Sequence, residues 1–169
     1  MTTQARAGFA SAFTDHMVLQ QGARLSAWGF GAPGEAVTVS FAGRTEVARV
    51  GRSGRWTVML PQLSASAQGR RLSATVGDTR LSCRNVLVGE VWLRAGQSNM
   101  ELGVDSADHA QEMAAAADLP GLRLYLVPKS SSPVPLESVL ARWRVCTRAW
   151  WFITAGADFL PWPTGSGGG

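Results

Sequence analysis

The chain has 169 residues, 46% of them hydrophobic and 17% charged, and its 16 basic and 12 acidic side chains give a net charge of +4. These values are typical of a globular protein with one ordinary domain, or with one small domain and part of another, and they exclude an intrinsically disordered chain. No apolar run approaches the ~18 residues that a transmembrane helix requires, so we predict no membrane partner.

The positive charge does not form a nucleic-acid-binding pattern. Most arginines stand singly along segments rich in turn residues, with one doublet at Arg70 and Arg71. Since no helix face or aromatic stripe collects them, we predict no nucleic-acid partner. The cysteines Cys83 and Cys146 are too few for a disulfide framework or a multi-cysteine metal site, so we expect two free buried thiols, no metal and no cofactor.

The start of the chain bears on its location. Residues 1–12 contain no apolar core of ~7 residues behind a basic start, so they do not form a secretory signal. The chain as written is therefore expected in the cytoplasm. A missing or mis-assigned start would instead allow a periplasmic or secreted location.

The first patterned segment, residues 13–21, alternates only in part between apolar and polar side chains. Asp15 and His16 within it could serve as an acid/base pair. We favour the alternative that they form a turn before a strand, because short polar side chains stabilise turns.

Residues 24–88 repeat one pattern, in which short runs of alternating apolar and polar residues are separated by Gly, Pro, Ser and Asp. An antiparallel β-sandwich over residues 1–86 is the fold that this spacing predicts. Trp28 and Trp56 could stack against a sugar, but core packing is the commoner fate of a strand Trp. The candidate strands are residues 24–30, 36–42, 45–50, 55–60, 70–76 and 79–86.

An apolar run at residues 86–93 has the length and composition of a buried strand. A tight turn is expected at Gly96, followed by the small or amide side chains Gln97, Ser98 and Asn99. The carboxyl end of a strand is where open α/β sheets bind ligands, so Ser98 is a candidate nucleophile. The motif is not the nucleophile elbow of α/β-hydrolases, because Met100 stands where that motif needs a second Gly.

The next segments predict the order strand, helix, strand. A helix capped by Asp105 or Ser106 should run to about Asp118, and residues 122–127 should form a second strand. This order implies a parallel sheet. Residues 148–169 have neither helical nor strand periodicity and are expected to be an irregular tail.

Three segments resemble one family. GEVWL at residues 89–93 followed by GQSNME at residues 96–101 is similar to the signature of the sialate O-acetylesterases, which are carbohydrate esterases of the SGNH hydrolase type. Residues 15–20 resemble the D-x-M-V-L-Q segment of that family, and residues 143–146 its W-x-x-C. Arg94 and Ala95 replace the usual Cys-Ser. The resemblance implies an accessory sandwich at 1–86, the start of an SGNH-like α/β domain at 87–147, and a tail, read as frameshifted, at 148–169.

The resemblance also implies a chemistry. Ser98 would be the nucleophile and its backbone N–H an oxyanion donor, supported by Gly96, Gln97 and Asn99, in the hydrolysis of O-acetyl esters on sialic acid or a related sugar. The catalytic base of the family lies in a D-x-x-H motif, which this sequence lacks, since its histidines are His16 and His109.

We therefore expect an amino-terminal fragment that is inactive alone. The alternative from another functional class is a non-catalytic carbohydrate-binding β-sandwich. The oligomeric state is not predicted.

Overall fold

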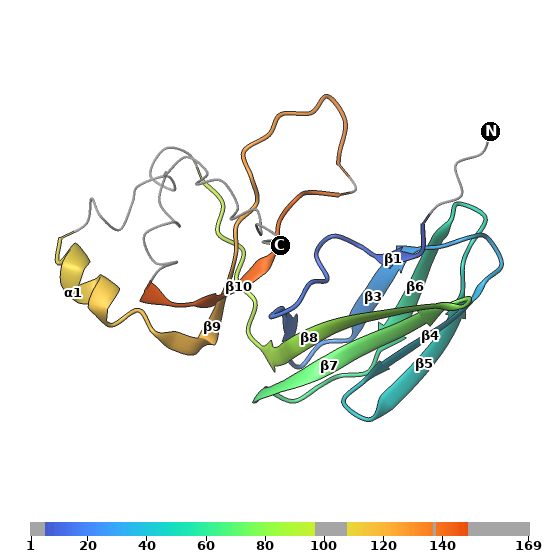
Figure 1. Ribbon diagram of the computed structural model, residues 1–169, viewed down its shortest axis with the longest axis horizontal. Helices are drawn as coiled ribbons and strands as arrows, with labels where there is room; N and C mark the ends of the chain where they lie inside the picture. The colour runs from blue at the N-terminus through green and yellow to red at the C-terminus, as the bar shows by residue number, and fades with distance from the viewer. Residues whose placement is uncertain (1–5, 97–107, 137, 149–169) are drawn as a thin grey trace, which may run out of the picture. The chain divides into compact units, whose positions relative to one another are not determined.

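The computed structural model describes residues 6–96, 108–136 and 138–148 (Figure 1). Within these ranges the chain is β-rich, with ten strands and one short helix. The elements are β1 (Gly8–Phe9), β2 (Val18–Gln20), β3 (Leu25–Phe30), β4 (Ala36–Phe41), β5 (Arg44–Arg49), β6 (Arg55–Leu60), β7 (Ser66–Val76), β8 (Thr79–Gly89), α1 (Ala110–Ala115), β9 (Leu119–Tyr125) and β10 (Trp143–Cys146).

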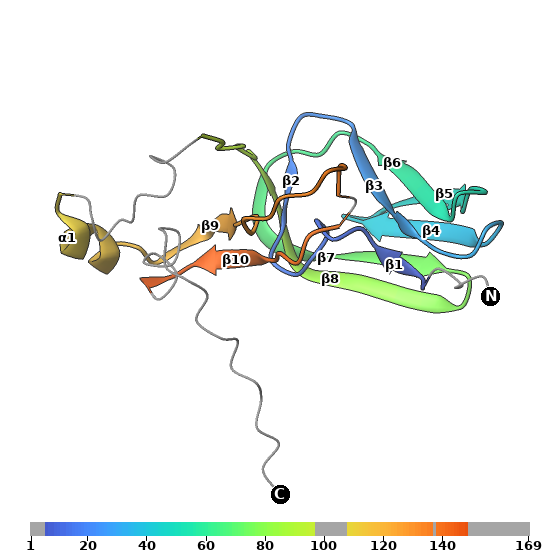
Figure 2. The same cartoon turned by 90° about the horizontal axis from the view of Figure 1, so that it is seen from above.

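The first eight strands form two sheets. One has three antiparallel strands in the order β1-β3-β6, and the other has five in the order β2-β8-β7-β4-β5. The five-stranded sheet is curled (Figure 2), and the β7–β8 pair contains two register shifts, between Ser66 and Arg70 and between Arg70 and Leu72. Such irregularities bend a strand and increase its twist.

The prediction of a purely antiparallel arrangement is wrong at one edge. β2 pairs parallel with β8, with Val18 opposite Leu87 and Gln20 opposite Gly89, so the larger sheet is mixed. Turn signals predict antiparallel hairpins between strands that are consecutive in the sequence. β2 and β8 are separated by five other strands, so no local signal specifies their relative direction.

Both sheets contribute to one hydrophobic core. Alternate residues of β4 and β6 point inward, as the sequence predicted, and Trp56 is only 1% exposed. Its indole N–H donates to the Phe30 carbonyl oxygen at 3.1 Å. Trp28 packs against the core edge-on to Phe13, with ring centroids 4.7 Å apart. Core packing is thus confirmed for both tryptophans.

β8 ends earlier than the predicted strand at residues 86–93. Val86, Leu87 and Val88 are buried as expected, whereas Trp92 is 83% and Leu93 91% exposed. The neighbouring strands explain the difference, because the pairing of β2 ends opposite Gly89 and that of β7 opposite Val88. Without a neighbour to bond, the chain leaves the extended ladder.

The chain divides into two compact units, Met1–Trp92 with Arg123–Arg144 and Leu93–Leu122 with Val145–Gly169. α1 lies in the second unit. It covers only part of the helix predicted to run to Asp118, and the predicted caps Asp105 and Ser106 lie outside the described residues. The domain boundary predicted after residue 86 stays a prediction.

The parallel β-α-β unit predicted around this helix is not observed. Among the described residues, β9 pairs with β10, while β8 pairs with β2 and β7. β9 also begins at Leu119, before the strand predicted at residues 122–127. No helix in the described ranges is long and apolar enough to cross a membrane.

Candidate functional site

The predicted nucleophile lies in a part of the chain that the structure does not describe. Gln97, Ser98 and Asn99 fall outside the described residues, so their roles stay predictions. Gly96 is described, and it is exposed and outside regular secondary structure.

The segment leading toward Gly96 is held by two glutamines at the end of β2. The Glu90 carboxylate accepts hydrogen bonds from Gln20 Nε2 at 2.8 Å and from Gln21 Nε2 at 2.6 Å. Both bonds lower the pKa of Glu90, and the bond from Gln20 has the larger effect. The Val91 N–H donates to Gln20 Oε1 at 2.8 Å, and the Gln21 N–H donates to the Gly89 carbonyl at 2.8 Å. Backbone and side chains together therefore fix the chain where β8 ends.

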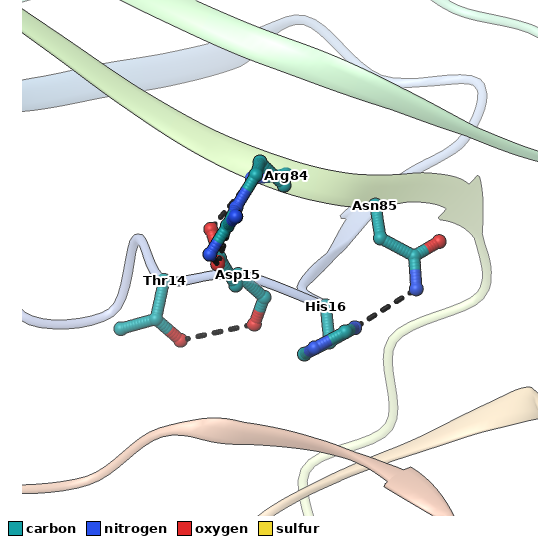
Figure 3. Close-up of polar contacts among 5 residues, drawn as sticks. All are labelled: Thr14, Asp15, His16, Arg84 and Asn85. Carbon is teal, nitrogen blue, oxygen red and sulfur yellow. Dashed lines mark hydrogen bonds and ion pairs between the residues drawn. The ribbon is translucent and has the colours of Figure 1, made fainter.

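A second polar group joins the turn before β2 to the middle of β8 (Figure 3). Asp15 accepts three hydrogen bonds from Arg84, from the backbone N–H at 2.6 Å, from Nε at 3.0 Å and from Nη2 at 2.9 Å. Burial raises the pKa of Asp15, but the hydrogen bonds and charge of Arg84 outweigh this, and the net pKa is lowered. The carboxylate is therefore an anion that fastens the turn to the sheet.

His16 and Asn85 lie beside this pair. Both have left-handed backbones, with φ values of 69° and 53°, and Asn85 Nδ2 lies 2.8 Å from His16 Nδ1 (Figure 3). Asp15 and His16 occupy the predicted turn, which is confirmed. They engage different residues of β8, Arg84 and Asn85, and so do not have the geometry of an acid/base pair.

β9 and β10 add residues to the same region. Arg123 Nη2 lies 3.5 Å from Asn85 Oδ1. Trp143 donates its backbone N–H to Thr14 Oγ1 at 3.1 Å and its indole N–H to the Ala12 carbonyl at 3.0 Å. Sequence reasoning missed Asn85 and Arg123. Arg123 could have been noticed in the sequence as the charged side chain within the apolar alternation of residues 122–127.

The remaining candidate groups have plain structural roles. His109 is at the start of α1 with a side chain 74% exposed, and its Nδ1 lies 3.5 Å from Glu112 Oε2. Cys83 and Cys146 are free and buried, as predicted. Burial raises the pKa of Cys83 to about 12, so this thiol is protonated and a poor nucleophile. In the described part of the chain, no group of three or more His, Cys, Asp or Glu residues could hold a metal ion.

Comparison with curated proteins identifies mammalian relatives. The chain is 33% identical to the sialate O-acetylesterase of Mus musculus over 144 residues, which cover 78% of this chain and 26% of that protein. The chain is a distant homologue of the sialate O-acetylesterases. It is 31% identical to the Homo sapiens sialate O-acetylesterase over 144 residues, covering 79% of this chain and 28% of that protein. This homologue thus spans about a quarter of the length of its curated relatives.

A solved structure supports the same relationship. A carbohydrate acetylesterase from Xanthomonas citri matches with a TM-score of 0.83 and 32% sequence identity, over 89% of this chain and 35% of that chain. No protein-family model matches the sequence. The family resemblance read from the sequence is confirmed by these relatives.

The homologue brings its family-like segments together. Residues 15–20 form the turn and strand that bind β8, and Glu90 at the end of β8 belongs to the GEVWL segment. Trp143 of the W-x-x-C segment binds Thr14 at the edge of that turn. Segments far apart in the sequence therefore meet at the amino-terminal turn.

Proposed function

We propose that this sialate O-acetylesterase homologue carries the nucleophile-bearing part of a carbohydrate esterase. Ser98 would attack the carbonyl carbon of an O-acetyl ester on sialic acid or a related sugar. The observation that carries the proposal is the homology, taken with the GQSN motif just after a segment held by Gln20 and Glu90. Nucleophilic attack requires a serine held in a defined geometry, and the fixed end of β8 would contribute to holding Ser98 in this way.

The proposed chemistry needs two kinds of assistance. A base must take the Ser98 hydroxyl proton, and donors must bind the oxyanion that forms as the ester carbonyl is attacked. The Ser98 backbone N–H is one proposed donor, with Gly96, Gln97 and Asn99 shaping the turn. His16 is hydrogen-bonded to Asn85, and His109 lies at the surface beside Glu112. We therefore propose that neither is the base and that the chain alone has no esterase activity.

The finer fold assignment belongs to the same proposal. We propose that residues 87–147 begin an SGNH-type α/β domain and that residues 1–86 serve it as an accessory domain. Chymotryptic cleavage of the native chain would test this division. A stable product ending close to residue 89, the last residue of β8, supports an independent accessory domain, and progressive degradation of the β-strands contradicts it.

The activity test uses a hybrid esterase. The chain is joined to the complementary part of the Xanthomonas citri carbohydrate acetylesterase, and acetate release is measured from an activated acetyl ester and from O-acetylated sialic acid. We expect activity that Ser98→Ala abolishes and that the control Ser130→Ala retains. Activity insensitive to Ser98→Ala would refute the nucleophile assignment. Ser98-dependent activity of the unjoined chain would refute the absence of a base.

The alternative function is non-catalytic carbohydrate binding. Exposed Trp92 favours it, because an aromatic ring 83% exposed offers a face to sugar C–H groups. Buried Trp56 argues against the stacking platform first considered. Glycan binding by the chain that is lost in Trp92→Ala would support this alternative, and its absence would exclude it.

A further inference from the structure

The region between the amino-terminal turn, β8 and β9 contains a linear set of polar contacts that the proposed esterase chemistry does not use. His16, Asn85 and Arg123, here called the His16 cluster, come from these three segments in turn. Asn85 lies in the middle, with its Nδ2 2.8 Å from His16 Nδ1 and its Oδ1 3.5 Å from Arg123 Nη2. All three residues are partly buried and belong to one compact unit.

The guanidinium determines which way the Asn85 amide points. Arg123 carries only donors, so the amide atom facing it must be the acceptor Oδ1. Among the described residues, Arg123 Nε is buried without a hydrogen-bond partner, and an amide turned the other way would place NH₂ against a cation already short of acceptors. Asn85 Nδ2 is consequently the atom that donates to His16.

This orientation in turn determines the protonation state of His16. Nδ1 must accept the hydrogen bond from Asn85, so the imidazole is neutral and carries its proton on Nε2. Protonation at Nδ1 would set an N–H donor against the Asn85 NH₂ group. Rotating the amide would remove that conflict but would turn NH₂ toward Arg123. When His16 is protonated, the Asn85 amide therefore makes one unfavourable donor–donor contact in either of its orientations, with His16 in one and with Arg123 in the other.

The backbone makes local escape costly. His16 and Asn85 both have positive φ, a conformation that non-glycine residues adopt only when their surroundings hold them there. The His16 N–H donates to the Arg84 carbonyl at 2.9 Å, which fixes the backbone of the turn beside β8. The donor–donor conflict is relieved more easily by a movement of Arg123, because its contact with Asn85 is the longer one.

We propose that the His16 cluster is a proton-coupled contact, which holds residues 123–125 of β9 to the turn and β8 while His16 is neutral and loosens that hold when His16 is protonated. This proposal goes beyond the esterase assignment and does not depend on it. Charged or titratable groups lie on each of the segments that meet in the cluster. The Asp15 carboxylate is negatively charged, and Arg84, which binds it, and Arg123, which contacts Asn85, are positively charged. Arg80 and Cys83 also lie on β8, Tyr125 lies on β9, and Arg144 lies on β10 with Arg142 just before it.

These neighbours keep a constant charge across the range in which histidines titrate. The pKa of Asp15 is lowered by Arg84 despite burial, so it stays ionised, and burial raises the pKa values of Cys83 and Tyr125, so they stay neutral. A transition between pH 8 and pH 5 in this region would therefore report on a histidine. The chain has two, and His109 in the other unit provides a matched control.

The test uses the complete chain and nuclear magnetic resonance. At pH 8 the ring nitrogen shifts of His16 should identify the Nε2–H tautomer, and between pH 8 and pH 5 the hydrogen-exchange protection of β9 amides should fall roughly fivefold after correction for intrinsic exchange. His16→Gln, which retains an acceptor for Asn85 without a titrating ring, should abolish the fall, and His109→Gln should preserve it.

Three results would overturn the proposal. They are an Nδ1–H tautomer at pH 8, protection of β9 that does not change with pH, and a change that persists in His16→Gln. If His16→Gln fails to fold, the tautomer of the unmodified chain and its pH titration still decide the question.

Discussion

Replacing Gly29 by alanine should test how closely β1, β3 and the core tryptophan are packed. A Cβ at this position would collide with the Gly8 carbonyl oxygen on β1 and would lie 2.6 Å from Trp56 Cζ2 and 2.9 Å from Trp56 Cε2. Neither neighbour can withdraw freely. The Gly8 oxygen belongs to the strand pair that joins β1 to β3, and Trp56 is 1% exposed and hydrogen-bonded to Phe30.

The expected cost follows from this rigidity. Overpacking of a core costs about 1–3 kcal/mol when side chains adjust, and here a backbone carbonyl must move as well, so we expect a loss of about 3 kcal/mol. For a domain of roughly 100 residues, that loss of free energy lowers Tm by roughly 12–24 °C. Thermal and urea unfolding followed by circular dichroism would measure both quantities.

Gly8→Ala is the matched control on the opposite strand. The nearest atom to its added Cβ would be the Arg6 carbonyl oxygen at 3.8 Å, an ordinary van der Waals distance. Since alanine restricts the unfolded chain more than glycine does, this change should be neutral or should stabilise by up to about 1 kcal/mol. Melting of Gly29→Ala and Gly8→Ala within about 2 °C of each other would refute the packing described for Trp56.

Three further predictions concern individual side chains. Because the folded-state pKa of Asp15 is lowered, its ionised form stabilises the fold above the ordinary carboxyl pKa, and this contribution is lost as the pH falls through the folded-state pKa. Asp15→Asn should therefore lower the free energy of unfolding in urea by about 1 kcal/mol at pH 6 and by much less at pH 2. An equal loss at both pH values would contradict the ion pair with Arg84. Cys83 should resist iodoacetamide at pH 8 until the chain is unfolded in urea, whereas rapid labelling of the native chain would contradict its burial. Gln20→Ala should accelerate hydrogen exchange at the Val91 amide several-fold, with Gln62→Ala as the control, and unchanged exchange would show that the contact with Gln20 does not hold this segment.

Local chemistry in the sequence determined most of the β domain. Alternation in β4 and β6 identified the buried faces, and turn residues placed β3 to β6 within a residue or so of their observed bounds. Side-chain direction alternates along any strand, so this information is present in each segment alone. The family-like motifs around residues 89–101 are equally local, and they were enough to identify the esterase relationship.

Tertiary structure decided which segments became neighbours. Periodicity says which side of a strand is buried, but it does not say which other strand lies beside it or in which direction. The parallel pairing of β2 with β8 and the end of β8 at Gly89 both depend on where a distant partner begins and stops. The His16 cluster depends on contacts between residues 69 and 38 positions apart in sequence, which bring an ordinary turn histidine, a strand asparagine and a lone arginine together.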